Sequence, residues 1–310
     1  MYSGPRTIAF EEPNTNYSCH LNETNLFSTA ESEKSEQYQG DHWYHLANMW
    51  QFVGPPLRPT SEDTLVREQF VHTWCQKTGQ HHPQCLLLGV TPEIVKMRWP
   101  PHSQILALDR NDEMIKHVYP GHSEQGFQVL QGDWTRLPVL DRQFDLILGD
   151  GCYVMFDYHR GFSLLSESIE KALKPNGQFI IRFFIRPEII ETSDQVFSDL
   201  LKGKICNFHL FKWRLAMAMH NDVETGVSLS KVWRIWEKMS IDSRFLADTM
   251  QWSIESIHTI QAYRRSNRRY TFPTKKELYA ALTPYFRISQ YYLPSYECGD
   301  RFPTLVLDRK

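Results

Sequence analysis

Long apolar runs, a secretory signal and an excess of charge of one sign are all missing from this sequence of 310 residues. No apolar run approaches the about 20 residues that a membrane-spanning helix needs. The N-terminus also lacks the basic segment and apolar core of a secretory signal. The formal net charge is only −2, so no overall field attracts nucleic acid or a membrane surface. We therefore expect a cytoplasmic protein without a membrane partner.

Closely spaced cysteine motifs are missing as well. The six cysteines, at positions 19, 75, 85, 152, 206 and 298, form no C-x-x-C pair, which is typical of a reducing compartment. His42 and His45 have an i, i+3 spacing that occurs in metal sites, but such spacings are common by chance. We expect neither a disulfide framework nor a metal.

Composition divides the chain into four parts. Residues 1–40 are rich in Glu, Ser, Asn and Thr and poor in core-forming residues, which predicts a flexible polar tail. Residues 41–188 are predicted to form an α/β core with an N-terminal helical cap. Residues 189–270 have a helical pattern, which predicts an inserted helical subdomain that serves as a lid. Residues 271–310 are predicted to complete the core with a helix and a strand hairpin.

The segment from Cys85 to Arg182 alternates short apolar runs with helical or turn-forming stretches. The first run is uninterrupted, as expected for a strand that is buried on both faces. This alternation predicts an α/β fold with a doubly wound, mostly parallel sheet. Acidic residues or glycines follow several runs, at the edge where sheets of this kind bind their ligands.

Two features predict a ligand that contains adenosine. Thr91, Pro92 and Glu93 follow Gly89 and begin a helix, whose first N–H groups would face the tip of the first strand. Asp109 ends the second strand about 20 residues after Gly89, at the spacing of an acid that binds ribose hydroxyls. These two features leave the kind of adenosine ligand open.

A third acid narrows the choice. Gly132, Asp133 and Trp134 directly follow the short strand 127–130. An acid in this position can accept a hydrogen bond from the adenine amino group, and an aromatic neighbour can cover the ring. With these residues the chain resembles the class I S-adenosylmethionine-dependent methyltransferases, over roughly residues 43–186 and again from 272 to the C-terminus.

The resemblance implies S-adenosylmethionine as cofactor and a Rossmann-like sheet of seven strands that ends in an antiparallel hairpin. In that family the loop after the first strand holds the methionyl part, and a fourth motif, here Asp150-Gly151-Cys152, lies beside the transferred methyl group. The residues assigned to the cofactor are Gly89, Val90, Thr91, Asp109, Arg110, Met114, Gly132, Asp133, Trp134, Asp150, Gly151, Cys152, Trp50 and Arg58.

The first motif departs from the family pattern. The family has an acid two residues before its first glycine and two further glycines after it, and these places hold Leu87, Thr91 and Glu93 here. One alternative is therefore a degenerate binding protein without catalysis. The same loop argues against a nicotinamide-dependent oxidoreductase, because close approach to a pyrophosphate needs G-x-G-x-x-G.

The acceptor is predicted to be a small molecule, either a carboxylate-bearing metabolite or an amino acid, methylated on N, O or S. Arg182 and Arg186 follow the fifth strand; they either grip a substrate carboxylate or pair with acids of the same domain. The other residues assigned to the substrate are Trp43 and Trp213. Because an N or O acceptor must lose a proton, the candidate bases are Tyr44, His42, Tyr153, Asp157 and His159.

A basic cluster leaves an RNA-modifying methyltransferase as another alternative. Arg264, Arg265, Arg268 and Arg269 have helical i, i+4 spacing, and Tyr263 and Tyr270 flank them as potential stacking platforms. Charge runs are usually solvated faces, so we expect no nucleic acid partner. The sequence leaves open whether the protein is a monomer or a homodimer.

Overall fold

The computed structural model describes residues 42–121, 126–140 and 143–310. These residues belong to one compact unit. The polar tail predicted for residues 1–40 lies outside the described residues. No helix in the described ranges has the length and apolar character to cross a membrane.

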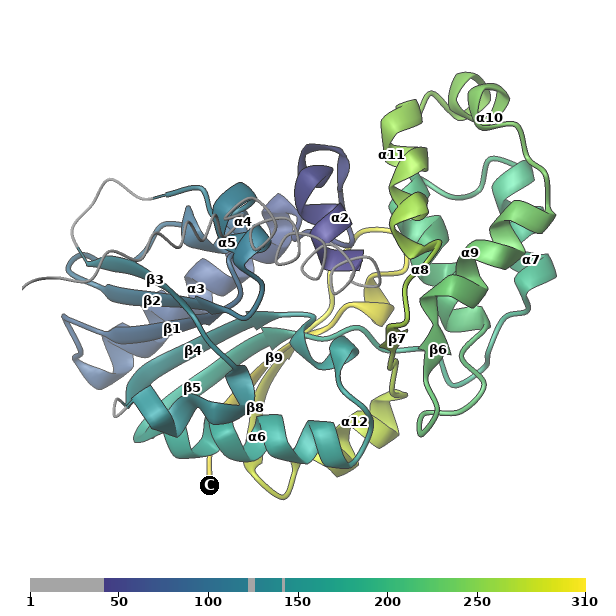
Figure 1. The fold of residues 1–310 in the computed structure, drawn as a ribbon. Helices are drawn as coiled ribbons and strands as arrows, with labels where there is room; N and C mark the ends of the chain where they lie inside the picture. Colours follow the sequence, from purple (N-terminus) through teal and green to yellow (C-terminus); the bar gives the residue numbers. More distant parts are fainter. Residues whose placement is uncertain (1–41, 122–125, 141–142) are drawn as a thin grey trace, which may run out of the picture. The chain divides into compact units, whose positions relative to one another are not determined.

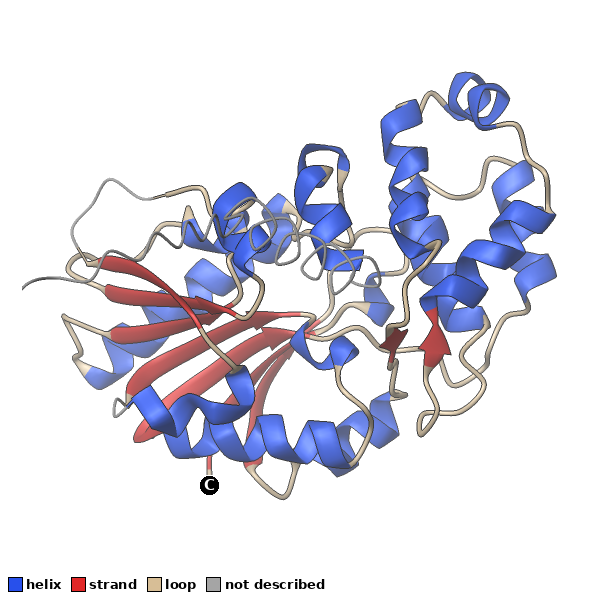
Figure 2. Cartoon of the chain, viewed as in Figure 1, coloured by secondary structure: helices blue, strands red, loops and turns tan. Residues whose placement is uncertain are grey.

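A seven-stranded sheet forms the centre of the described unit (Figures 1 and 2). The strands are β1 (Gln84–Leu88), β2 (Gln104–Asp109), β3 (Phe127–Gln131), β4 (Phe144–Asp150), β5 (Leu173–Arg182), β8 (Phe286–Tyr292) and β9 (Thr304–Arg309). Their order is β3-β2-β1-β4-β5-β9-β8. Strands β1 to β5 pair in parallel, and β9 runs antiparallel to both β5 and β8. The predicted fold class, including the terminal hairpin, is confirmed.

Helices cover both faces of the sheet. The helices around the sheet are α2 (His42–Asn48), α3 (Ser61–Thr78), α4 (Pro92–Val95), α5 (Asp112–His117), α6 (Arg160–Ala172) and α12 (Lys275–Leu282). Short 3₁₀ turns lie at Trp50–Phe52 (η1), Trp134–Leu140 (η2), Cys152–Met155 (η3) and Gly299–Arg301 (η5). Leu86 and Leu88 point to the face covered by α6 and α12, whereas Cys85 and Leu87 point to the face covered by α3, α4 and α5. Successive residues of a strand face opposite sides, so β1 is apolar throughout because both of its sides are covered.

The helix α3 begins at a capping box. Thr60 caps it, because its hydroxyl accepts the Asp63 N–H at 3.1 Å while the Asp63 carboxylate accepts the Thr60 N–H at 2.8 Å. A second capping box, between Thr274 and Glu277, begins α12. The helix predicted after β1 is present as α4, but it is short and lacks a side-chain cap. α4 has only four residues, and the Thr91 side chain makes no capping hydrogen bond.

Residues 193–270 are mostly helical and pack around one buried helix. This segment contains α7 (Ser193–Leu201), α8 (Phe208–Ala218), α9 (Leu229–Lys238), α10 (Ser243–Met250), α11 (Ile254–His258), the 3₁₀ turn η4 (Thr259–Tyr263) and the paired strands β6 (Val227–Ser228) and β7 (Arg269–Tyr270). Every residue of α8 from Phe208 to Met217 is buried. Its apolar cluster also includes Leu46 of α2 and Phe184 just after β5, so the helical segment packs beside the carboxyl ends of the central strands (Figure 1).

Candidate active site

A cavity of about 300 Å³ opens at the carboxyl ends of β1, β2 and β4. The strand order changes direction between β1 and β4, which is where open α/β sheets bind ligands. Sixteen of the predicted site residues lie on its wall: His42, Trp43, Trp50, Arg58, Gly89, Val90, Thr91, Asp109, Arg110, Met114, Asp133, Trp134, Asp150, Gly151, Asp157 and Trp213. The other seven, Tyr44, Gly132, Cys152, Tyr153, His159, Arg182 and Arg186, do not line it.

The nucleoside side of the cavity is built around Gly89 and Asp109. Gly89 has a φ of +99°, a conformation that favours glycine. A Cβ there would lie 3.7 Å from Asp109 Oδ2 and 3.8 Å from the Trp134 ring, so the absent side chain leaves space between these two groups. Asp109 Oδ1 accepts the Asn111 N–H at 2.8 Å, which orients the carboxylate at the end of β2.

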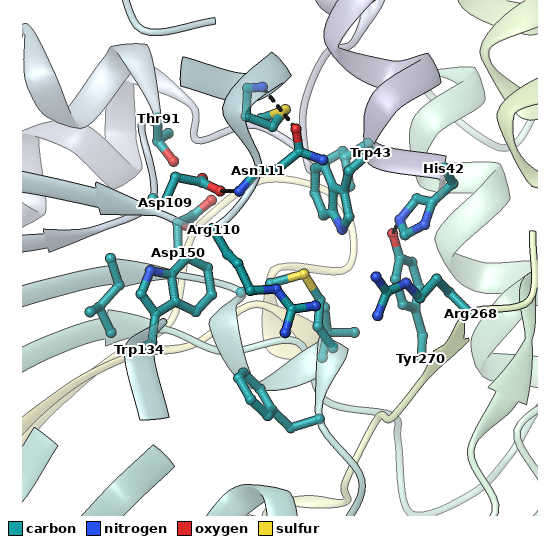
Figure 3. A pocket seen from close by; sticks show the side chains of 18 of the residues that line it. His42, Trp43, Thr91, Asp109, Arg110, Asn111, Trp134, Asp150, Arg268 and Tyr270 are labelled. Atoms are coloured by element: carbon teal, nitrogen blue, oxygen red, sulfur yellow. Dashed lines mark hydrogen bonds between the residues drawn. The ribbon is translucent and has the colours of Figure 1, made fainter. Parts of the chain in front are cut away.

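The third acid and its aromatic neighbour are also fixed in place. The Asp133 carboxylate accepts hydrogen bonds from the Thr135 N–H at 2.9 Å and the Thr135 hydroxyl at 2.8 Å. Burial favours a raised pKa of Asp133, but the bonds from Thr135 and the nearby Arg110 outweigh it and lower the pKa below its usual value. The Trp134 indole N–H donates to the Leu108 carbonyl at 2.7 Å. The carboxylates of Asp109 and Asp133 and the Trp134 ring thus line one cavity, in which Figure 3 shows Asp109 and Trp134 on the same side; this arrangement fits an adenosine.

Glu93, which stands where the family's first motif has a glycine, forms an ion pair with Arg58. Arg58 Nε donates to Glu93 Oε1 at 2.7 Å, and its Nη2 lies 2.5 Å from the same oxygen. The guanidinium carbon also lies 5.4 Å from the Trp50 ring centre. A helix as short as α4 provides little dipole, and Arg58, although paired with Glu93, is the cationic side chain that lines the cavity beside Val90 and Thr91.

The fourth motif lies between the cavity and a buried ionic cluster. Asp150 lines the cavity, yet its Oδ1 accepts Arg182 Nε at 2.7 Å and Arg67 Nη2 at 2.5 Å. Gly151 has a φ of +62°, and a Cβ there would lie 2.3 Å from the Phe184 ring, so the turn requires glycine. Cys152 points away from the cavity into the core, where burial raises the pKa of its thiol.

The two arginines assigned to a substrate carboxylate bind carboxylates of the chain instead. Arg182 is fully buried, and its guanidinium also contacts Asp63 Oδ2 at 3.1 Å and the Pro56 carbonyl at 2.9 Å. Burial favours a lowered pKa of Arg182, but the charges of Asp150 and Asp63 raise it. Arg186 Nη2 lies 3.1 Å from Glu277 Oε1. This is a correction: a buried guanidinium needs an anionic partner, and these acids provide it.

Among the candidate bases, His42 and Asp157 line the cavity. The Tyr153 hydroxyl is buried against Ser166 Oγ at 2.7 Å, and His159 is exposed beside Glu224 at 3.0 Å. His42 is buried, and its Nε2 lies 2.6 Å from the Tyr270 hydroxyl. Burial first, and then the charges of Arg268 and Lys212, lower the pKa of His42 to about 3. His42 is therefore neutral at physiological pH.

The side of the cavity opposite Asp109 is mainly aromatic and was only partly predicted. Trp213 stacks on Tyr270 with ring centres 5.3 Å apart and an interplanar angle of 17°, and it lies 4.8 Å from Phe184. Cavity-lining residues that sequence reasoning did not assign are Leu57, Leu88, Asn111, Val154, Met155, Phe156, Phe184, Arg268, Arg269 and Tyr270. Figure 3 shows His42, Tyr270 and Arg268 together, across the cavity from Asp109 and Trp134.

The basic cluster is not the helical stripe that its spacing predicts. Residues 266–268 have no regular secondary structure, and Arg269 begins β7. Arg264 lies over the Trp233 ring at 5.3 Å, whereas Arg268 and Arg269 reach the cavity. Arg269 Nη2 donates to the Gly226 carbonyl at 2.8 Å. The i, i+4 pattern could not distinguish a turn at the cavity from an exposed helix.

In the described residues no group of three or more His, Cys, Asp or Glu could hold a metal ion.

The fold is that of a doubly wound α/β protein, and the residues on the wall of its cavity fit an adenosine-containing ligand. Residues 89–181 match the family model described as "Methyltransferase domain". No match was found among curated proteins. The match to the family model makes residues 89–181 a methyltransferase domain, for which S-adenosylmethionine is the cofactor.

Solved structures with similar folds share little sequence with this chain. A protein titled a putative Zn-dependent alcohol dehydrogenase from Rhodobacter sphaeroides has a TM-score of 0.58 at 11% identity, covering 88% of this chain and 98% of that one. PH0226 from Pyrococcus horikoshii has a TM-score of 0.48 at 14% identity, covering 84% and 98%. The N-methyltransferase NodS from Bradyrhizobium japonicum, solved with S-adenosyl-L-homocysteine, has a TM-score of 0.47 at 10% identity, covering 87% and 99%. At 11% identity the first likeness concerns the fold alone.

S-adenosylmethionine supplies an electrophilic methyl group when it is bound. Its nucleoside would be held by Gly89, Asp109, Asp133 and Trp134. Arg58 lines the same cavity, together with Val90 and Thr91 of the first motif. Asp150 and Gly151 lie between this side of the cavity and the aromatic side. The chain's contribution is to align the reacting groups and to exclude water.

Proposed function

We propose that the protein transfers the methyl group of S-adenosylmethionine to a small, flat acceptor molecule. The observation that carries this proposal is that one cavity joins the nucleoside side to the aromatic wall formed by Trp43, Phe184, Trp213 and Tyr270. Pockets that bind small molecules are typically concave and lined by aromatic side chains with a few polar groups. A cavity of about 300 Å³ lies at the small end of the range for such pockets, about 300–1,000 Å³.

The polar groups of the aromatic wall favour an acceptor that carries a hydrogen-bonding group. His42 is neutral and hydrogen-bonded to Tyr270, so this pair would orient a hydroxyl or amino group toward the methyl donor. Arg182 and Arg186 bind acids of the chain itself, so they do not support the substrate carboxylate that the sequence predicted.

The test has a binding step and a turnover step. Calorimetry with S-adenosylhomocysteine should give micromolar binding, and binding of NADH should be absent at the same concentration. Purified protein is then incubated with labelled S-adenosylmethionine and a panel of phenols, aromatic amines, amino acids, aliphatic carboxylates and RNA, and methylated products are identified by mass. Methylation of a flat small molecule supports the proposal. Methylation of RNA, or of aliphatic compounds alone, contradicts it, and cofactor binding without any product supports the non-catalytic alternative.

A further inference from the structure

The loop after β1 cannot bind an anionic group in the way a glycine-rich loop does. Such loops bring several backbone N–H groups close to the ligand. Here Thr91 carries a branched side chain, Pro92 has no N–H, and Glu93 adds a carboxylate. The one-turn helix α4 that follows ends at Val95. The methionyl part of the cofactor is a zwitterion, so its carboxylate needs a cationic or donor-rich partner from another segment.

Arg58 has the position and the orientation for this role. It lines the cavity with Leu57, Val90 and Thr91, and its side chain keeps 23% of its surface exposed. Its Nη1 donates weakly to the carbonyls of Trp50 at 3.4 Å and Val53 at 3.3 Å. Together with the bonds to Glu93 described above, these contacts hold the guanidinium in one orientation.

A second donor lies on the same wall without an acceptor. The indole N–H of Trp50 is buried and has no hydrogen-bond partner, although Trp50 lines the cavity and its ring contacts Arg58. A buried donor without a partner is costly, so a shift of the Trp50 ring toward an anion bound beside Arg58 would be favourable. Glu93 Oε1 accepts both contacts from Arg58, and this carboxylate is not on the cavity wall.

We propose that Arg58 binds the carboxylate of the methionyl part of S-adenosylmethionine, and that Glu93 is a positioning residue that orients Arg58. The Arg58–Glu93 pair thereby replaces the glycine-rich loop of the first motif. An arginine suits this task because it has five N–H donors: Nε and Nη2 bind Glu93, and the cofactor carboxylate would accept from the remaining Nη2 hydrogen and from Nη1, whose two contacts at 3.3 and 3.4 Å are long. The inference concerns only cofactor binding, so its failure would leave the proposed acceptor untouched.

The experiment compares two ligands by calorimetry: S-adenosylhomocysteine, which has the amino acid group, and 5′-methylthioadenosine, which lacks it. Wild-type protein should bind the first more tightly. Arg58→Met should weaken binding of S-adenosylhomocysteine at least tenfold and change binding of 5′-methylthioadenosine less than twofold, because only the first ligand carries the carboxylate. Arg58→Lys should give an intermediate loss. Arg110→Met is the matched control, since this arginine lines the same cavity on the nucleoside side and should not discriminate between the ligands.

Glu93→Gln tests the positioning role. It should weaken binding of S-adenosylhomocysteine selectively, but the double variant with Arg58→Met should bind no worse than Arg58→Met alone. Unchanged S-adenosylhomocysteine binding in Arg58→Met, an equal loss for both ligands, or wild-type protein that does not prefer S-adenosylhomocysteine would each overturn the proposal. Additive losses in the double variant would overturn the role of Glu93.

Discussion

His42 Nε2 lies 2.6 Å from the hydroxyl of Tyr270, although 228 positions separate the two residues in the chain. His42 belongs to α2 and Tyr270 to β7, and both line the cavity across from Asp109. The pair supplies a hydrogen-bonded polar site within a mainly aromatic wall. It is therefore the part of the cavity that would orient the accepting group of the substrate.

From this hydrogen bond we predict that a change at Tyr270 lowers turnover but leaves cofactor binding unchanged. Tyr270→Phe keeps the ring that stacks on Trp213 but removes the hydroxyl, so kcat with the acceptor found in the panel should fall about tenfold to a hundredfold, corresponding to about one lost hydrogen bond to the reacting group. Calorimetry with S-adenosylhomocysteine should give an unchanged Kd. A variant that loses cofactor affinity and turnover in parallel would show that Tyr270 has only a structural role.

The nucleoside assignment predicts a loss of cofactor affinity on changing Asp109. Asp109→Ala removes the carboxylate beside Gly89, and each charged hydrogen bond contributes about 1.5–3 kcal/mol. Binding of both S-adenosylhomocysteine and 5′-methylthioadenosine should therefore weaken at least tenfold. The control is Asp112→Ala, an acid of α5 outside the cavity-lining set, which should bind both ligands normally. Unchanged affinity in Asp109→Ala would show that the ribose assignment is wrong.

The buried ionic cluster predicts a large stability effect without a substrate role. Arg182 is fully buried and contacts both Asp150 and Asp63, so Arg182→Met leaves two buried carboxylates short of a partner. Removing one member of a buried pair typically costs about 3–5 kcal/mol, which urea unfolding would measure. Arg287→Met removes an exposed partner of Asp308 and should change the free energy of unfolding by less than about 0.5 kcal/mol. A similar small change in Arg182→Met would contradict the assigned role.

Lys212 predicts a dependence of stability on alkaline pH. It is buried in α8, its Nζ donates to Thr259 Oγ1 at 2.7 Å, and burial lowers its pKa from 10.5 to about 7. Between these two values the unfolded chain binds more protons than the folded chain, so the contribution of Lys212 to stability should rise as the pH increases from 7 toward 10.5. Lys212→Met should remove this rise while keeping the packing volume.

Urea unfolding of both proteins at several pH values in that range measures the effect. The double difference between the variant and wild-type protein cancels other titrating groups. A double difference that stays constant with pH would show that Lys212 has an ordinary pKa in the folded protein.

Local patterns predicted the sheet, and they also predicted residues that lie together on the cavity wall, because both depend on short segments. The apolar run before Gly89 and the acid at Asp109 determine a strand and its end within a few residues. By contrast, the partners of Arg182 come from α3 and β4, and sequence spacing cannot identify such contacts. The choice between a substrate carboxylate and an internal acid therefore required the tertiary structure.

Sequence spacing was also unable to place Arg268 and Tyr270 at the cavity. Tyr270 was interpreted as a stacking platform beside a basic stripe with i, i+4 spacing, which was the basis of the RNA alternative. The chain forms turns there instead, and β7 pairs with β6, which brings Arg268 and Tyr270 to the cavity. The spacing of Thr91, Pro92 and Glu93 predicted a helix without its length, and Pro100 and Pro101 follow closely in the sequence and limit it.

The two sides of the cavity have separate origins in the chain. Asp109, Asp133 and Asp150 lie within the segment that matches the methyltransferase domain, whereas His42, Trp213 and Tyr270 lie outside it. Under the proposed function, mutation could therefore remodel the outer set and change the acceptor while the residues assigned to the cofactor stayed intact. Exchanging residues around α2 and β7 between homologues is accordingly the most direct route to engineering altered selectivity in this scaffold.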